Sequence, residues 1–299
     1  MKIAFDPVYI HPLPAGHRFP MEKYELIPLQ LLREGVITPA QLFAPTPLEE
    51  AIILYTHDVD YWHKLKHQTL SDREQRRIGF TQSPALTLRE ITICQGTIDC
   101  ALHALQHGVA LNVAGGTHHA YADRGEGFCL LNDFAVAANY LLRQLLVKQI
   151  LIIDLDVHQG NGTAALFQGN DQVFTFSMHG ANNYPFHKET SDLDIPLTDG
   201  TDNSTYLTLL EDTLPTLINR VQPDLVFYLS GVDILETDKF GKLKLTQAGC
   251  RQRDEMVFSL LHQHGIPCAV AMGGGYSVNI KDIVNAHCNT FKAAAEIFN

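Results

Sequence analysis

The sequence has no uninterrupted apolar run of about 18 residues, the length that a membrane-spanning helix requires. Near its start, Asp6 and Pro7 interrupt the apolar residues before a signal-peptide core could form. Basic residues are also comparatively few, because 22 lysines and arginines stand against 33 aspartates and glutamates, which gives a net charge of -11. This balance argues against nucleic acid or an anionic membrane as partner and suits a positively charged peptide or amine better. We therefore expect a soluble, cytoplasmic protein.

The six cysteines form no C-x-x-C pair, the spacing typical of many metal-binding and redox motifs. Most of them lie in apolar runs, so we expect buried thiols in a reducing compartment. The chain also lacks internal repeats, low-complexity tracts and recognisable linkers. Because 45% of its 299 residues are apolar, it can bury a large core, and we expect a single domain over residues 1–299.

From residue 109 onward, apolar strand-like runs alternate with helix-like runs, a pattern typical of a parallel β-sheet flanked by helices. The expected strands are 2–5, 109–113, 150–155, 173–178, 225–230 and 267–272, and the expected helices are 21–33, 57–68, 88–107, 133–147, 203–220, 246–264 and 280–297. Asn203 and Thr246 are suitable N-caps, and Gly265 is a plausible stop signal. The sequence thus predicts an α/β fold.

Reactive side chains or glycines follow every one of the five later strands. In chain order they are Gly115, Gly116, His118 and His119; Asp156 and His158; His179; Gly231 and Asp233; and Gly273, Gly274, Gly275 and Tyr276. Ligands of open parallel sheets bind outside the carboxyl ends of the strands. We therefore expect these groups to converge on one crevice.

The segment 150–162, ILIIDLDVHQGNG, indicates a metal site at the end of a buried strand. Asp156 and His158 are two residues apart, so their side chains project to the same side of an extended chain. With Asp233 they would supply three ligands and leave one position open for water, as in catalytic zinc sites. Metal-bound water has a pKa of about 7, so it is partly hydroxide, a nucleophile, at neutral pH. By itself, D-x-H more often marks a polar turn, and Asp233 could be a helix cap.

Proton transfer would fall to the adjacent histidines His118 and His119. If Asp154 contacts His118 and Asn161 contacts His119, the carboxylate favours a charged His118 and the neutral amide leaves His119 free to act as general base and then acid. The sequence does not decide which histidine meets which partner. Tyr276 follows three glycines and could donate to the oxyanion that forms from a carbonyl, although a core tyrosine is the simpler alternative.

A narrow apolar slot is expected beside this site. Gly127 and Phe128 lie in RGEGFCLLND, and Tyr184 could flank them from the other side. Such a slot would accept an extended methylene chain and make these three residues the substrate-binding candidates.

The ordered motifs GGTHHA, GEGFCLLND, DLDVHQGNG, SGVDILETDKFG and MGGGY resemble those of the zinc-dependent histone deacetylase family, and GHRFPMEKY resembles its class IV branch. The resemblance implies a three-layer arginase/deacetylase fold and hydrolysis of the amide on an acylated lysine. It also implies Zn2+, with Fe2+ as an alternative. A structural K+ would lie near the backbone of Asp154, Asp156 and His158 and the Ser177 hydroxyl. Three features depart from the pattern of the family. Asn161 stands where class I enzymes have an aspartate, and the segment MHGANNYPFHKE matches poorly. No acidic residue that would hold a peptide backbone at the rim of the site is recognisable.

Three alternatives remain at this point. The substrate could be a small acylated amine such as an acetylpolyamine, because loops rather than the metal centre choose between substrates. Arginase-like enzymes bridge two manganese ions, but the extra carboxylate positions are Gly160 and Leu235 here, so a second metal lacks ligands. A non-catalytic acyl-lysine binding protein is the third, though it has no need of water, two histidines and a tyrosine. The sequence does not specify acyl length or oligomeric state.

Overall fold

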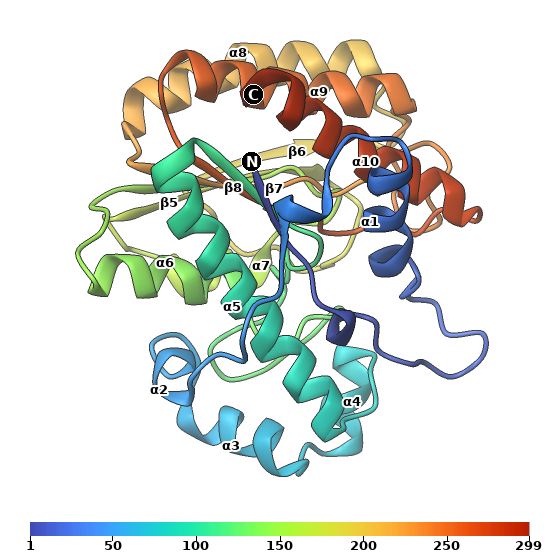
Figure 1. Cartoon of the computed structure of the whole chain (residues 1–299), viewed down its shortest axis with the longest axis vertical. Coiled ribbons are helices and arrows are strands. Elements are labelled where there is room, and N and C mark those ends of the chain that lie inside the picture. Colours follow the sequence, from blue (N-terminus) through green and yellow to red (C-terminus); the bar gives the residue numbers. More distant parts are fainter. Residues whose placement is uncertain (299) are drawn as a thin grey trace.

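An eight-stranded, all-parallel β-sheet forms the centre of the computed structural model, which describes residues 1–298 (Figure 1). Its strands are β1 (Lys2–Ala4), β2 (Leu42–Phe43), β3 (Val109–Asn112), β4 (Ile150–Asp154), β5 (Val173–Gly180), β6 (Leu193–Leu197), β7 (Leu225–Leu229) and β8 (Cys268–Ala271). Their order across the sheet is β2-β1-β3-β8-β7-β4-β5-β6. The predicted α/β fold with a parallel sheet is confirmed.

The central strands are apolar throughout because both faces of the sheet are covered. Every residue of β3, β4, β7 and β8 is buried. These four strands are neighbours in the order β3-β8-β7-β4, and the same chain direction brings their carboxyl ends to one edge. In the register of the sheet, Asp154 at the end of β4 pairs with Ser177 on β5 and with Leu229 on β7. The four loops that carry the reactive side chains therefore start side by side.

Helices form a layer on each side of the sheet, and the layers are clear in Figure 1. They are α1 (Lys23–Arg33), α2 (Glu50–Ile53), α3 (Val59–His67), α4 (Asp72–Ile78), α5 (Pro84–His107), α6 (Asp133–Arg143), α7 (Asn161–Phe167), α8 (Asn203–Val221), α9 (Gln247–Gln263) and α10 (Ile280–Phe298), with short 3-10 helices at Pro7–Tyr9 and Pro39–Gln41. Helices α8, α9, α10 and α1 cover one face, and α5 and α6 cover the other (Figure 1). Helices α2 to α4 gather around the far end of α5. No helix among residues 1–298 is both long and apolar enough to cross a bilayer.

Two predicted helix ends and one predicted N-cap were wrong, and local chemistry explains each of them. The helix expected at 88 begins at Pro84, because the Ser83 hydroxyl accepts the Leu86 amide and proline suits the first helical position. The helix expected to reach 147 ends at Arg143, since Leu145 adopts a left-handed conformation. Asp202 rather than Asn203 caps α8. The Thr246 cap of α9 is confirmed.

The prediction also missed two strands and three short helices. Strand β2 has two residues, and β6 contains Pro196 at the open edge of the sheet, where a missing amide hydrogen is tolerated. Helices α2, α4 and α7 have seven residues or fewer, so they show too little of a 3.6-residue period. Helix α7 matters for the site because it begins at Asn161.

Candidate functional site

The side chains of Asp156, His158 and Asp233 meet at the carboxyl end of β4 and β7. One ligand atom from each lies within 4.8 Å of the other two. Nδ1 of His158 is 3.0 Å from Oδ1 of Asp156 and 3.1 Å from Oδ2 of Asp233. All three residues are buried. The structure therefore brings together the three residues that the sequence predicted as metal ligands.

Backbone hydrogen bonds fix the two carboxylates of this cluster. The amides of His158 and Gly274 donate to Asp156 at 3.0 and 2.8 Å, and the Val157 amide donates to Oδ1 of Asp233 at 2.9 Å. Glycine is required at 274, because a Cβ there would lie 2.0 Å from Oδ2 of Asp233. The glycine run after β8 thus lets the backbone approach the carboxylates closely.

The cluster has the donor set and the electrostatics of a site for a divalent cation. Oδ2 of Asp233 is buried and accepts no hydrogen bond from residues 1–298. Burial, together with the neighbouring Asp156 charge, raises the pKa of Asp233 to about 7. Burial opposes protonation of His158, but Asp156 and Asp233 outweigh it and raise the His158 pKa to about 10. Two carboxylates that stabilise a positive charge on His158 this strongly would also stabilise a metal cation, and together with the imidazole they offer it oxygen and nitrogen ligands.

We expect chelator-treated protein to lose stability as the pH rises from about 6.5 towards 10. A raised folded-state pKa of His158 stabilises the fold fully below the unfolded value, and this contribution disappears as pH rises through the folded value. Ionisation of Asp233, whose folded pKa is also raised, acts in the same direction between pH 4 and 7. Melting temperatures of chelated and zinc-loaded protein should diverge with rising pH. A constant difference from pH 6 to 9 would contradict this.

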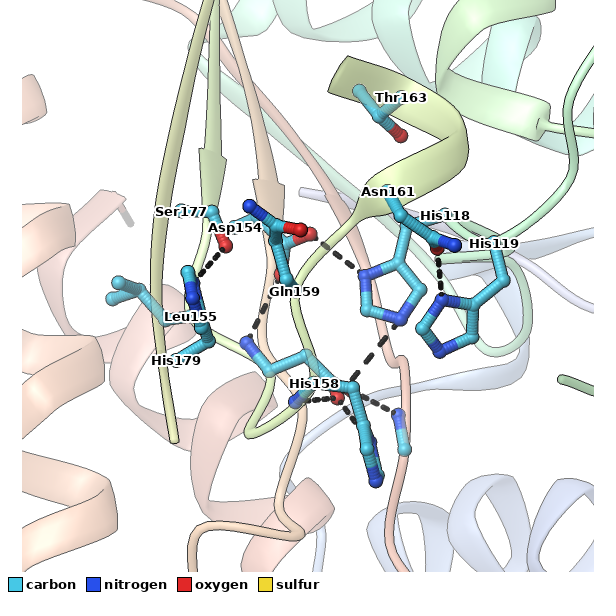
Figure 2. Close-up of polar contacts among 12 residues, drawn as sticks. His118, His119, Asp154, Leu155, His158, Gln159, Asn161, Thr163, Ser177 and His179 are labelled. Atoms are coloured by element: carbon cyan, nitrogen blue, oxygen red, sulfur yellow. Dashed lines mark hydrogen bonds and ion pairs between the residues drawn. The ribbon is translucent and has the colours of Figure 1, made fainter. Parts of the chain in front are cut away.

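The two adjacent histidines have different partners. Nδ1 of His118 lies 2.7 Å from Oδ2 of Asp154, and Nδ1 of His119 lies 2.6 Å from Oδ1 of Asn161. Figure 2 shows both contacts, with the two rings side by side and their centroids 4.1 Å apart. The sequence analysis considered these two pairings but did not decide which histidine meets which partner.

The partners separate the protonation states of the two rings. Burial disfavours the charged form of His118, but Asp154 outweighs it and raises the His118 pKa. Burial lowers the pKa of His119 well below its usual value, and the nearby His118 and His158 lower it further. The amide nitrogen of Asn161 donates to the Tyr121 hydroxyl at 3.0 Å, so its oxygen faces His119 and accepts from Nδ1. Nε2 of a neutral His119 is then the unprotonated nitrogen.

A cavity of about 520 Å³ leads from the surface to this cluster, and Gly127, Phe128, Tyr184 and Tyr276 line it with His119 and His158. The rings of Phe128 and Tyr276 are 6.0 Å apart, and the Tyr184 ring lies edge-on to His119 at 4.9 Å. Gly127 has a φ of 58°, and a Cβ there would lie 2.6 Å from the His119 ring. The predicted slot residues and Tyr276 therefore line one cavity. The cavity continues inward as a pocket of about 40 Å³.

Sequence reasoning missed three residues that support the site. Oδ2 of Asp238 accepts from the Tyr276 amide at 2.6 Å and so positions that tyrosine. Glu126 accepts from the Tyr184 hydroxyl at 2.6 Å. Fully buried Lys23 donates to the Gly273 carbonyl at 2.8 Å, and burial lowers its pKa to about 8. Lys23 lies in GHRFPMEKY, a motif that the sequence analysis singled out without giving its lysine a role.

The residues suggested for a monovalent cation also come together. Ser177 pairs in register with Asp154, and its hydroxyl lies 3.0 Å from Nδ1 of His179 (Figure 2). Oδ1 of Asp154 accepts from the Asp156 amide at 3.1 Å. The potassium site stays a prediction.

Comparisons with known proteins find similar sequences and structures over nearly the whole chain. A family model described as "Histone deacetylase domain" matches residues 17–291. The chain is 44% identical to an uncharacterized protein of Picosynechococcus sp. over 99% of both chains. It is 29% identical to histone deacetylase 2 of Arabidopsis thaliana, over 87% of this chain and 70% of the relative. A crystal structure of an HDAC homologue complexed with SAHA matches in fold with a TM-score of 0.85 and 24% identity, over 99% of this chain and 84% of that one.

Proposed function

Since the chain belongs to the histone deacetylase family, we propose that it is a metal-dependent deacylase that hydrolyses the amide of N-acylated lysine side chains. The observation that carries this proposal is the position of three buried ligand groups beside two histidines with unlike partners. His119 and His158 line the large cavity, and His118 and Asp156 line the small pocket. Zn2+ is the proposed metal, and Fe2+ would suit the same ligands. Asp156, His158 and Asp233 would hold it. When bound, such an ion would polarise the carbonyl group of the substrate and lower the pKa of water.

His119 is the proposed general base. Its Nε2 is unprotonated when Nδ1 donates to Asn161, and its lowered pKa keeps it so at neutral pH. It can accept a proton from the attacking water and return this proton to the leaving amine. His118, held charged by Asp154, stabilises the negative charge that develops on the substrate.

Tyr276 is the proposed donor to the substrate oxyanion. Its ring lines the cavity next to His158, at a centroid distance of 6.5 Å. Burial and the nearby carboxylates Asp233 and Asp156 raise its pKa well above the usual value, so the hydroxyl keeps its proton. A neutral phenol in this position can donate to the oxygen of a tetrahedral intermediate. Phe128 and Tyr184 would flank the methylene chain of the substrate.

An Asn161→Asp variant should shift the acid limb of the kcat/KM pH profile to higher pH. An anionic partner stabilises the protonated form of His119, so its pKa rises and the free base is lost at a higher pH than in the wild type. The measurement is a profile on an acetyl-lysine peptide. Asn170→Asp, the same change on the loop after α7, is the control and should leave the profile unchanged. A profile of Asn161→Asp that matches the wild type would argue against His119 as base.

The function itself can be tested with purified protein loaded separately with Zn2+ and Fe2+. Hydrolysis of acetyl-lysine peptides supports the proposal. Hydrolysis of acetylated polyamines alone would favour the small-amine alternative. Binding of acyl-lysine peptides without turnover, with either metal, would favour a non-catalytic binding protein.

A further inference from the structure

The outer part of the large cavity is positively charged. Its lining includes five cationic side chains and no aspartate or glutamate, and the cations are Arg18, Arg76, Arg77, Lys239 and Lys242. We call these five residues the basic rim. All five are exposed. The whole chain has the opposite balance, with 33 acidic against 22 basic residues. The charge at the entrance is therefore opposite in sign to the net charge of the chain. The sequence analysis favoured a cationic partner because it used the net charge alone.

Protein carboxylates neutralise little of the basic rim. Within residues 1–298, Lys242 alone of the five has a carboxylate within 4.0 Å, and its contact to Asp199 is 3.8 Å long between half-exposed groups. Arg18 instead lies over the Phe240 ring, 5.7 Å from its centre. The charges of the basic rim are thus available to a ligand.

Nearby acids are engaged elsewhere. Glu126 accepts from the Tyr184 hydroxyl and from Arg124. Asp238 accepts from the backbone amides of Phe240, Gly241 and Tyr276. Neither lines the cavity.

The rim residues come from three separate segments that surround one entrance. Arg18 precedes α1, Arg76 and Arg77 belong to the last turn of α4, and Lys239 and Lys242 follow β7. An acyl-lysine whose methylene chain lies between Phe128 and Tyr184, as proposed above, would leave its backbone and flanking residues at this entrance. A cleft lined by one sign of charge concentrates ligands of the opposite sign and raises their association rate by about tenfold or more.

We propose that the basic rim selects acyl-lysines that lie in acidic peptide segments, with aspartate or glutamate side chains on either side of the modified residue. This inference rests on the proposed deacylase function. Flanking carboxylates contact Arg76 and Arg77 at the end of α4 and Lys239 and Lys242 in the segment after β7. Segments rich in lysine or arginine are repelled, and so are acetylpolyamines, because their free amines are positively charged.

The test uses three acetyl-lysine peptides of equal length, whose flanking residues are acidic, neutral or basic. At low ionic strength, kcat/KM of the metal-loaded enzyme should fall in that order, with an acidic-to-basic ratio of at least about tenfold. Most of the difference should lie in KM. The ratio should approach one near 1 M salt, where the Debye length is about 3 Å.

Charge reversal identifies the residues responsible. The double variant Arg76→Glu, Arg77→Glu should lower the acidic-to-basic ratio by about tenfold or invert it. Arg73→Glu reverses one charge on the same helix, outside the cavity lining, and should keep the wild-type ratio. Lys239→Glu, in the segment after β7, gives a second test that is independent of α4 and should also lower the ratio.

The outcomes separate this inference from the proposed function. Hydrolysis of all three peptides with a ratio near one, or with preference for the basic peptide, would overturn the selection of acidic segments and leave the deacylase function standing. An equal loss of ratio in Arg73→Glu would also overturn the role of the basic rim. Failure to hydrolyse any peptide would refute the function and, with it, the inference.

Discussion

An Asp233→Asn variant is expected to lose its metal and to hydrolyse acetyl-lysine peptides at least about 10³-fold more slowly than the wild type. The substitution removes one of the two carboxylates that face Nδ1 of His158, while the amide oxygen can still accept from Val157. The metal is expected to supply several kcal/mol of transition-state stabilisation, and each tenfold in rate corresponds to about 1.36 kcal/mol. Metal content by elemental analysis and kcat/KM are the two measurements.

Asp238→Asn is the matched control for metal content. It makes the same chemical change in the same loop, but Asp238 contacts backbone amides rather than the ligand cluster. Its metal content should stay near that of the wild type. Full metal content and normal turnover in Asp233→Asn would remove Asp233 from the ligand set. A lowered melting temperature in both variants, with equal metal loss, would indicate unfolding rather than loss of a ligand.

A Tyr276→Phe variant should lose a factor of about 10² to 10³ in kcat and keep its metal. Loss of one preorganised oxyanion donor costs roughly 2.7 to 4 kcal/mol. The ring should stay in place, because it packs 5.0 Å from Phe240 and the Tyr276 amide still donates to Asp238. The loss should appear in kcat and kcat/KM alike, since the hydrogen bond forms with the transition state.

Tyr140→Phe on α6 is the control for removal of a tyrosine hydroxyl outside the cavity and should be as active as the wild type. If Tyr276→Phe is nearly as active as the wild type, this hydroxyl takes no part in the reaction. If KM rises and kcat stays constant, Tyr276 binds substrate rather than the oxyanion.

Apolar runs made the central strands predictable. Strands β3, β4, β7 and β8 are buried on both faces, so they are continuous in hydrophobicity and start within one residue of the expected positions. Where burial is partial, the signal weakens. Strand β6 at the sheet edge is only partly buried, has five residues and contains Pro196, and it was missed.

The candidate site was predictable as a set of residue types but not as a set of contacts. The rule that ligands bind at the carboxyl ends of parallel strands brought His118, Asp156 and Asp233 to one edge. It did not determine that Asp154 faces His118 and Asn161 faces His119, because Asp154 ends β4 and Asn161 follows the same strand, so both partners lie at the same edge of the sheet. That choice depends on helix α7, which begins at Asn161 and is too short to show a periodicity.

The sequence by itself determined the order of the buried strands and the longer helices along the chain and the donor atoms available for a metal, because both depend on residues close in sequence. The tertiary structure decided which ring is charged and which is neutral, since that depends on burial and on contacts between loops. It also decided the charge at the entrance. Arg18, Arg77 and Lys242 are far apart in the chain, and the packing of three segments around one cavity brings their positive charges together. The whole protein, in contrast, has a net negative charge.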